Sequence, residues 1–148
     1  MNTLHANKTL AYINAQAAAA SHLLSLLKGY MEKEFEGKFE ILEPGGQVLG
    51  LKFCSVEIRI KTEIRTKMAV LKPGGPSSLP ADVKSVVAAY LVTRKANNEV
   101  GGLESLGKAI EFNERGIIQG MQENQFADAF MEPVLNDLFS HKNVVFVP

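Results

Sequence analysis

The sequence contains few of the residues from which disulfides, metal sites and nucleophilic active sites are built. Its 148 residues include one cysteine, three histidines and no tryptophan. The single cysteine, Cys54, excludes an intramolecular disulfide and suits a reducing compartment, so we expect a cytoplasmic protein. His5, His22 and His141 lie far apart and lack the closely spaced partners of a zinc site. We therefore expect no metal ion and no other cofactor.

Long apolar runs and phosphate-binding glycine motifs are also absent. No apolar segment approaches the ~20 residues that a membrane-spanning helix needs, and the first residues lack the pattern of a signal peptide. We therefore expect no membrane partner. The glycine doublets at 45–46, 74–75 and 101–102 lack the spacing of a nucleotide-binding loop. They predict turns.

Charge is unevenly distributed along the chain, although the net charge is zero. Residues 57–95 include eight basic and three acidic residues, whereas residues 96–148 include three basic and eight acidic residues. Such segments attract each other within one chain or between two chains, so we expect a homodimer. The length and the hydrophobic content of 46% fit one globular domain spanning residues 1–148.

Residues 56–68 alternate strictly between two kinds of side chain. Even positions are apolar or threonine, and odd positions are all charged. Because successive side chains of a strand point to opposite faces, this pattern predicts a strand with one dry face and one charged face. Such a strand would be about 43 Å long, more than the diameter of about 38 Å expected for the domain. It must therefore curl, break near Thr62 or project.

The first part of the chain predicts a long helix. Its apolar residues follow heptad spacing: Leu10, Ile13, Ala17, Ala20, Leu24, Leu27 and Met31. Asn7 is the expected N-cap and Gly37 the expected stop signal. The stripe fits either a helix lying across the sheet or a seam with a second subunit.

Glycine and proline divide the rest of the chain into short elements. Strands at 38–42 and 48–53 form one predicted hairpin, and strands at 106–112 and 116–121 form a second. Residues 72–80 predict a loop, and Asn124 is the expected cap of a final helix that contains Pro133. The apolar tail at 144–147 fits an edge strand or a segment that pairs with a partner.

Residues 83–94 are the ambiguous segment. Val83, Val86, Val87, Tyr90 and Leu91 repeat at helical spacing, whereas the β-branched content of the same segment indicates a strand. We favour the helix, which gives the order α-βββ-α-ββ-α. The expected fold is an α+β domain with an antiparallel sheet of about five strands and helices packed on one face.

The charged face of the strand at 56–68 is the strongest candidate for a functional surface. No convergent set of catalytic residues is recognisable, so we expect a non-enzymatic protein. Arg59, Lys61, Arg65 and Lys67 would form a docking surface for an acidic protein partner, which this protein would inhibit, neutralise or chaperone.

Four alternatives remain open. Cross-strand ion pairs would make the charged face a solvated surface without a partner. The same basic residues would suit a nucleic acid, although zero net charge and the lack of tryptophan disfavour this role. The tail at 144–147 would serve a structural subunit of a larger assembly. An enzyme would need an active site assembled from scattered residues under the loop at 72–80.

Overall fold

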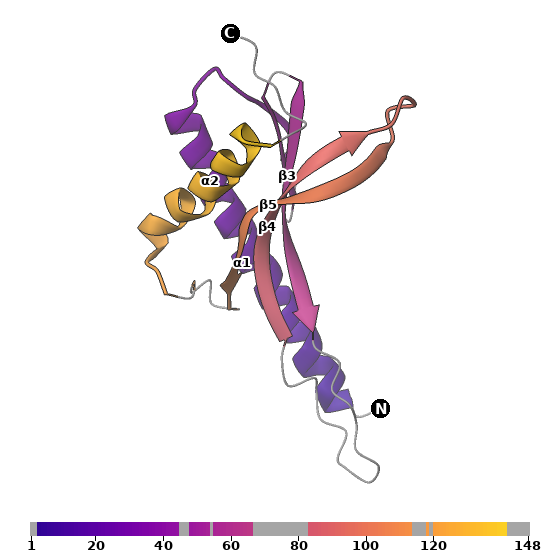
Figure 1. Cartoon of the computed structure of the whole chain (residues 1–148). Helices are drawn as coiled ribbons and strands as arrows, with labels where there is room; N and C mark the ends of the chain where they lie inside the picture. The colour runs from indigo at the N-terminus through magenta and orange to yellow at the C-terminus, as the bar shows by residue number, and fades with distance from the viewer. Residues whose placement is uncertain are drawn as a thin grey trace.

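The computed structural model describes residues 3–44, 48–53, 55–66, 83–113, 118 and 120–141. The elements in chain order are α1 (Thr3–Glu34), β1 (Glu40–Pro44), β2 (Val48–Phe53), β3 (Val56–Thr66), β4 (Val83–Arg94), β5 (Val100–Phe112) and α2 (Glu123–Phe139). The strands form one antiparallel sheet in the spatial order β1-β2-β3-β4-β5 (Figure 1). The predicted α+β class and antiparallel sheet are confirmed.

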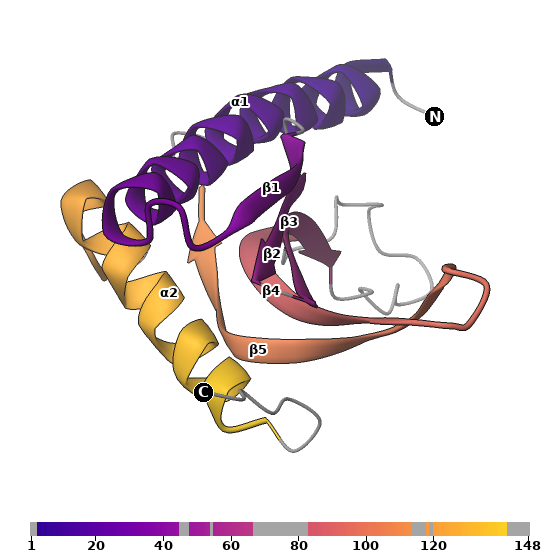
Figure 2. The ribbon, with the colours of Figure 1, turned by 90° about the horizontal axis from the view of Figure 1, so that it is seen from above.

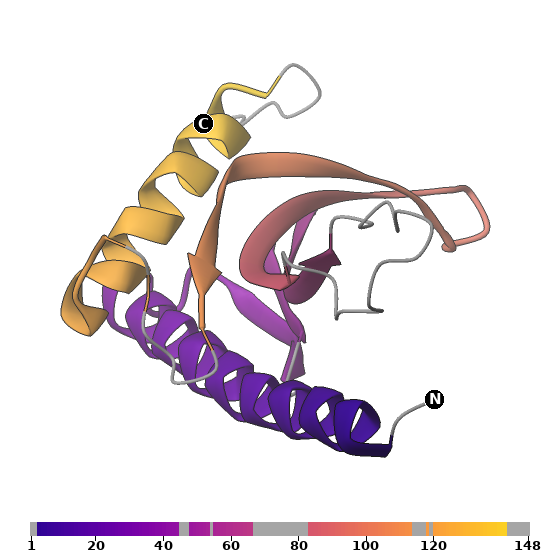
Figure 3. The same cartoon turned by 90° about the horizontal axis from the view of Figure 1, so that it is seen from below.

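Strand β3 confirms the alternation in the sequence. It pairs with β4 at every position from Glu57 to Thr66 and therefore passes Thr62 without a break. Its even-numbered residues Ile58 and Ile60 are fully buried, whereas Glu57, Arg59, Lys61 and Glu63 are partly exposed. The strands accommodate their length by bending, most visibly in β4 and β5 (Figures 2 and 3). Residues 67 and 68 lie outside the described part of the chain.

The helix favoured for residues 83–94 is wrong, because this segment forms strand β4. β4 lies between β3 and β5, and residues of both its faces are buried between Ser85 and Val92. Val87, Ala89 and Leu91 belong to the core on the helix side. The opposite side is buried too: Val86 and Ala88 are only 3% and 5% exposed. A strand with apolar residues on both faces loses its period of two, and spacings of three and four then arise without a helix.

Strand β5 begins earlier than predicted. Gly101 and Gly102 lie within it instead of forming the predicted turn. The β4–β5 turn uses Asn98, whose φ of 68° is tolerated by asparagine better than by most residues. Of the second predicted hairpin, strand 106–112 is confirmed as part of β5. Ile118 forms an antiparallel bridge with Phe112, and its neighbours 114–117 and 119 lie outside the described residues.

Helix α1 confirms the predicted stripe from Ala20 to Met31, although it begins at Thr3, so that Asn7 lies inside the helix instead of capping it. A chain that is already helical before Asn7 leaves no free N–H groups there for a cap. The C-terminal half of α1 packs on the sheet through Ala20, Leu23, Leu24, Leu27 and Met31, all 3% exposed or less. After α1 ends at Glu34, the chain turns at Gly37, whose φ is 75°.

Helix α2 begins two residues earlier than predicted, with Gln122 as N-cap instead of Asn124. The side chain of Gln125 satisfies the Gln122 backbone N–H at 3.2 Å, so a chain without serine or aspartate at this position is still capped. Pro133 lies inside the helix, which continues to Phe139. Phe126, Phe130, Val134 and Leu138 face the core.

Both helices cover the same face of the sheet and meet at an angle (Figure 2). Polar contacts join them at their edges: His22 Nε2 lies 2.7 Å from Glu123 Oε1, and the Tyr30 hydroxyl donates to Asp128 at 3.1 Å. Burial raises the Tyr30 pKa, and the hydrogen bond to Asp128 adds to the rise.

Three predicted features fall outside the described residues, namely Cys54, the loop at 72–80 and the tail at 144–147. Neither α1 nor α2, the helices of the described part, is both long and apolar enough to cross a membrane.

Candidate functional site: the charged face of the sheet

The sheet face opposite the helices carries charged side chains from four neighbouring strands. We call it the charged face, and its members are Glu40 on β1, Lys52 on β2, Glu57, Arg59, Lys61 and Glu63 on β3, and Tyr90, Val92 and Arg94 on β4. The register explains this set. Lys52 and Val92 both lie opposite Glu57, and Tyr90 lies opposite Arg59, so their side chains share one side of the sheet.

Glu57 and Arg94 form a bidentate pair across β3 and β4. Arg94 Nε donates to Glu57 Oε2 at 2.7 Å, and Nη2 donates to Oε1 at 2.8 Å. Arg94 Nη1 also donates to the backbone carbonyl of Asn98 at 2.9 Å, which fixes the guanidinium against the β4–β5 turn. The hydrogen bonds from Arg94 hold the Glu57 pKa below its ordinary value of 4.5. The pair therefore forms a rigid part of the surface.

A second group of contacts surrounds Lys61. Its ammonium lies 3.6 Å from Glu63 Oε1 and 5.0 Å from the centre of the Tyr90 ring, where a cation is attracted to the aromatic face. The Tyr90 hydroxyl donates to the same Glu63 oxygen at 2.5 Å. These contacts hold Lys61 over β4.

Arg59 and Lys52 differ from these paired groups. Neither side chain forms a hydrogen bond or an ion pair with any other residue in the described part of the chain. Both side chains are partly exposed, and both lower the Glu57 pKa through their charge. They are therefore the cations of the charged face that an incoming anion meets first.

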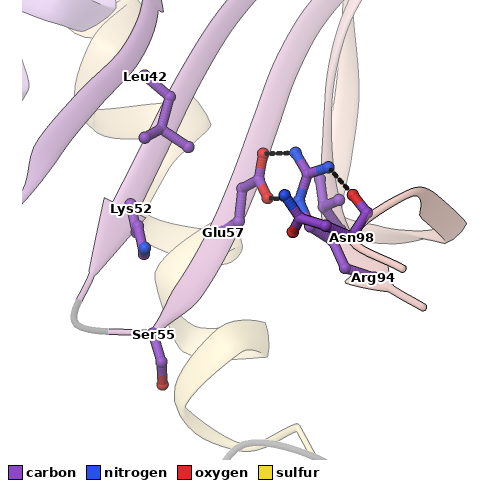
Figure 4. A pocket seen from close by; sticks show the side chains of 7 residues that line it. Leu42, Lys52, Ser55, Glu57, Arg94 and Asn98 are labelled. Atoms are coloured by element: carbon purple, nitrogen blue, oxygen red, sulfur yellow. Dashed lines mark hydrogen bonds and ion pairs between the residues drawn. The ribbon is translucent and has the colours of Figure 1, made fainter. Parts of the chain in front are cut away.

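A pocket of about 440 Å³ opens at one end of the charged face (Figure 4). Its lining residues come from β1, from β2 and β3 with their connection, and from β4 with its turn: Leu42, Lys52, Ser55, Glu57, Val92, Arg94 and Asn98. Leu42 is 36% exposed. The lining of the pocket thus combines two cations, Lys52 and Arg94, and the Glu57 carboxylate with the apolar side chains of Leu42 and Val92, which form its apolar wall.

The structure brings together two of the four predicted docking residues. Arg59 and Lys61 lie on the charged face. Arg65 lies on β3 opposite Lys84, but its side chain is not described, and Lys67 lies outside the described residues. Sequence reasoning missed Lys52 and Arg94. The predicted hairpin at 48–53 followed by the strand at 56–68 would have placed Lys52 beside Glu57, whereas Arg94 required the correct assignment of β4.

A second pocket, also of about 440 Å³, differs in charge. It lies where α1 ends and is lined by Glu32, Glu36, Gly37, Phe39 and Ile41. No group of three or more His, Cys, Asp or Glu side chains among the described residues is arranged to hold a metal ion. The first pocket, which Lys52 and Arg94 line and which we call the basic pocket, is therefore the stronger candidate for recognition of an anionic group.

No protein-family model, no curated protein and no solved structure gives a significant match to this chain.

Proposed function

We propose that this protein is a small non-enzymatic binding module that docks an acidic protein partner on its charged face, and that it inhibits, neutralises or chaperones that partner. The observation that supports this most directly is that Arg59 and Lys52 form no hydrogen bond or ion pair with another described residue. Both lie on a sheet face that neither helix covers. The neighbouring Arg94 is held in place, so little side-chain freedom is lost on binding.

The pairing on the charged face narrows the docking surface. Lys61 is engaged by Glu63 and Tyr90, which fits the alternative of a solvated face for that part of β3. The docking surface is therefore centred on Arg59 and extends toward Lys52 and Leu42. A homodimer and a cytoplasmic location belong to the proposal as well, and sedimentation of the purified protein would measure the first.

A nucleic acid is the second candidate, and it fits the surface less well. Tyr90 is the aromatic residue of the charged face, and its ring already carries the Lys61 ammonium. A base would have to displace that contact before it stacked on the ring. Glu57 and Glu63 would also repel phosphates at the same place.

Affinity capture with matched variants tests the proposal. The double variant Arg59→Glu/Lys61→Glu reverses the centre of the charged face, and Lys33→Glu/Lys38→Glu reverses two exposed cations at the end of α1. We expect the unmodified protein and the α1 variant to retain one stoichiometric protein that high salt releases, and the charged-face variant to lose it. Circular dichroism would confirm that each variant is folded.

Equal capture by the charged-face variant would overturn the proposal. Recovery of nucleic acid alone, with affinity that falls steeply as salt rises, would favour the second candidate.

A further inference from the structure

The basic pocket combines two kinds of wall, and this combination restricts what it can hold. Lys52 and Arg94 place two positive charges against the single carboxylate of Glu57, so the lining has an excess of positive charge. Both Glu57 oxygens accept hydrogen bonds from Arg94. An incoming carboxylate therefore meets the Lys52 ammonium without having to displace a partner in the described part of the chain.

The apolar wall lies beside this ammonium. Leu42 is 36% exposed on β1, the strand at one edge of the sheet, and it lines the pocket (Figure 4), as does Val92 of β4. An exposed leucine in the same pocket as a lysine that has no hydrogen bond or ion pair with another described residue forms a surface for a segment that carries both an acidic and an apolar side chain. A nucleotide has no such apolar group, and the described lining residues offer its base no aromatic ring on which to stack.

The shape of the pocket is held by its own backbone and side-chain contacts. The Arg94 guanidinium bonds to the Asn98 carbonyl at 2.9 Å, and the Asn98 N–H donates to the Lys95 carbonyl at 2.9 Å. The turn beside Arg94 is thus fixed before a ligand arrives. Such preorganisation lowers the entropy lost on binding.

From these features we infer that the pocket is an anchor site for an extended acidic segment of the protein partner. One carboxylate of the segment binds Lys52, and an apolar side chain two residues away packs on Leu42. This inference rests on the proposed function, because it names the part of the charged face that binds a defined segment of the partner. Side chains two residues apart on an extended chain point to the same side, at a spacing of about 7 Å.

Synthetic peptides provide the first test. The probe is a fluorescein-labelled decapeptide with Glu and Leu two residues apart at its centre and Ser and Gly elsewhere. One control peptide has Lys in place of Glu, and a second has Ser in place of Leu. Fluorescence anisotropy with the full chain would give the affinities, and amide NMR shifts at Lys52, Ser55 and Asn98 would locate the binding.

We expect the Glu–Leu peptide to bind at least about tenfold more tightly than either control peptide. Lys52→Glu should weaken it by about tenfold or more, and Leu42→Ser by about fivefold, whereas Lys33→Glu should leave the affinity unchanged. Equal binding of all three peptides, no binding at millimolar concentration, or no effect of Lys52→Glu would overturn the inference. Displacement of the peptide by a single-stranded oligonucleotide would overturn it in favour of phosphate recognition.

The captured partner separates this inference from the proposed function. If Lys52→Glu and Leu42→Ser retain the partner while Arg59→Glu/Lys61→Glu loses it, docking on the charged face is supported and the anchor site is contradicted. If all three variants retain the partner, both the proposed docking and the anchor site are contradicted.

Discussion

The two faces of the sheet are held by different forces. On the helix side, Leu51, Ile58 and Ile60 have no exposed surface and pack against α1 and α2 in one apolar core. On the charged face, the side chains of Glu57, Lys61 and Arg94 are 13%, 31% and 36% exposed, and ion pairs hold them in place. Both faces are built from the same strands, and in β3 from alternate residues.

This difference separates stability from recognition. Full burial of a large apolar side chain contributes about 1.5–3 kcal/mol, whereas an exposed ion pair contributes at most about 1 kcal/mol. Substitutions on the helix side should therefore lower stability strongly, and those on the charged face should mainly alter binding. A protein that uses its charged face for recognition can change that face and still fold.

The largest effect is expected from Phe130 on the helix side. Its side chain is 1% exposed and stacks on Phe126 at a centroid distance of 5.9 Å. Phe130→Ala removes this contact and leaves a cavity, so we expect the free energy of unfolding to fall by about 3–5 kcal/mol. Urea denaturation would measure it. A loss below about 1 kcal/mol would show that α2 is not part of one cooperative core.

Gly107 is the next position, where β5 meets α2. Its φ is 66°, and a Cβ placed there would lie 2.8 Å from Val134 Cγ2 and 2.9 Å from the Val134 backbone nitrogen. The glycine N–H also donates to Asp137 Oδ2 at 2.7 Å. Gly107→Ala combines an unfavourable backbone conformation with a steric clash, and we expect a loss of about 2–4 kcal/mol in urea denaturation.

Gly29→Ala is the matched control for Gly107. Gly29 lies inside α1, and a Cβ there would have no atom within 4 Å. Alanine should therefore stabilise the protein by about 0.5–1 kcal/mol through its helix propensity. Equal effects of the two substitutions would contradict the close approach of β5 and α2.

A smaller effect is expected for Glu57 on the charged face. Its pKa is lower in the folded protein than its ordinary value of 4.5, so its contribution to stability is present above that pH and is lost as the pH falls below it. Glu57→Gln should reduce the free energy of unfolding by about 1 kcal/mol at pH 7. The difference should shrink as the pH falls below 4.5 and through the lowered pKa of Glu57.

Urea denaturation of both proteins across this pH range is the measurement. A difference between them that stays constant with pH would show that the Arg94 hydrogen bonds do not favour the ionised form of Glu57.

The sequence predicted the fold where each face of an element had a distinct character. The sequence of β3 alternates without exception, and the structure buries Ile58 and Ile60 on the helix side while their neighbours carry charge. The stripe of α1 is read correctly from Ala20 to Met31 for a similar reason. β4 was misread because its burial does not alternate: Val87 is fully buried and Val86 is 3% exposed. Local spacing cannot distinguish a strand buried on both faces from a buried helix.

The candidate site was predictable only in part, because its residues come from strands whose register had to be known. Arg59 and Lys61 lie on one strand, and the period of two places them together. Lys52 and Arg94 join them through pairing with β3, and Arg94 does so from the strand that was predicted to be a helix. Long-range pairing depends on tertiary packing, which a short stretch of sequence does not encode.

Substitution of Arg59 should have the smallest effect on stability, and it should show most clearly that the charged face affects binding and not folding. Its side chain is partly exposed and has no hydrogen bond or ion pair with another described residue, so Arg59→Ala should change the free energy of unfolding by less than about 0.5 kcal/mol. If the charged face recognises an acidic partner, the same substitution should still weaken capture of that partner. A loss of stability above about 1 kcal/mol would instead assign Arg59 to the fold, and the contrast between the two faces would no longer hold at the centre of β3.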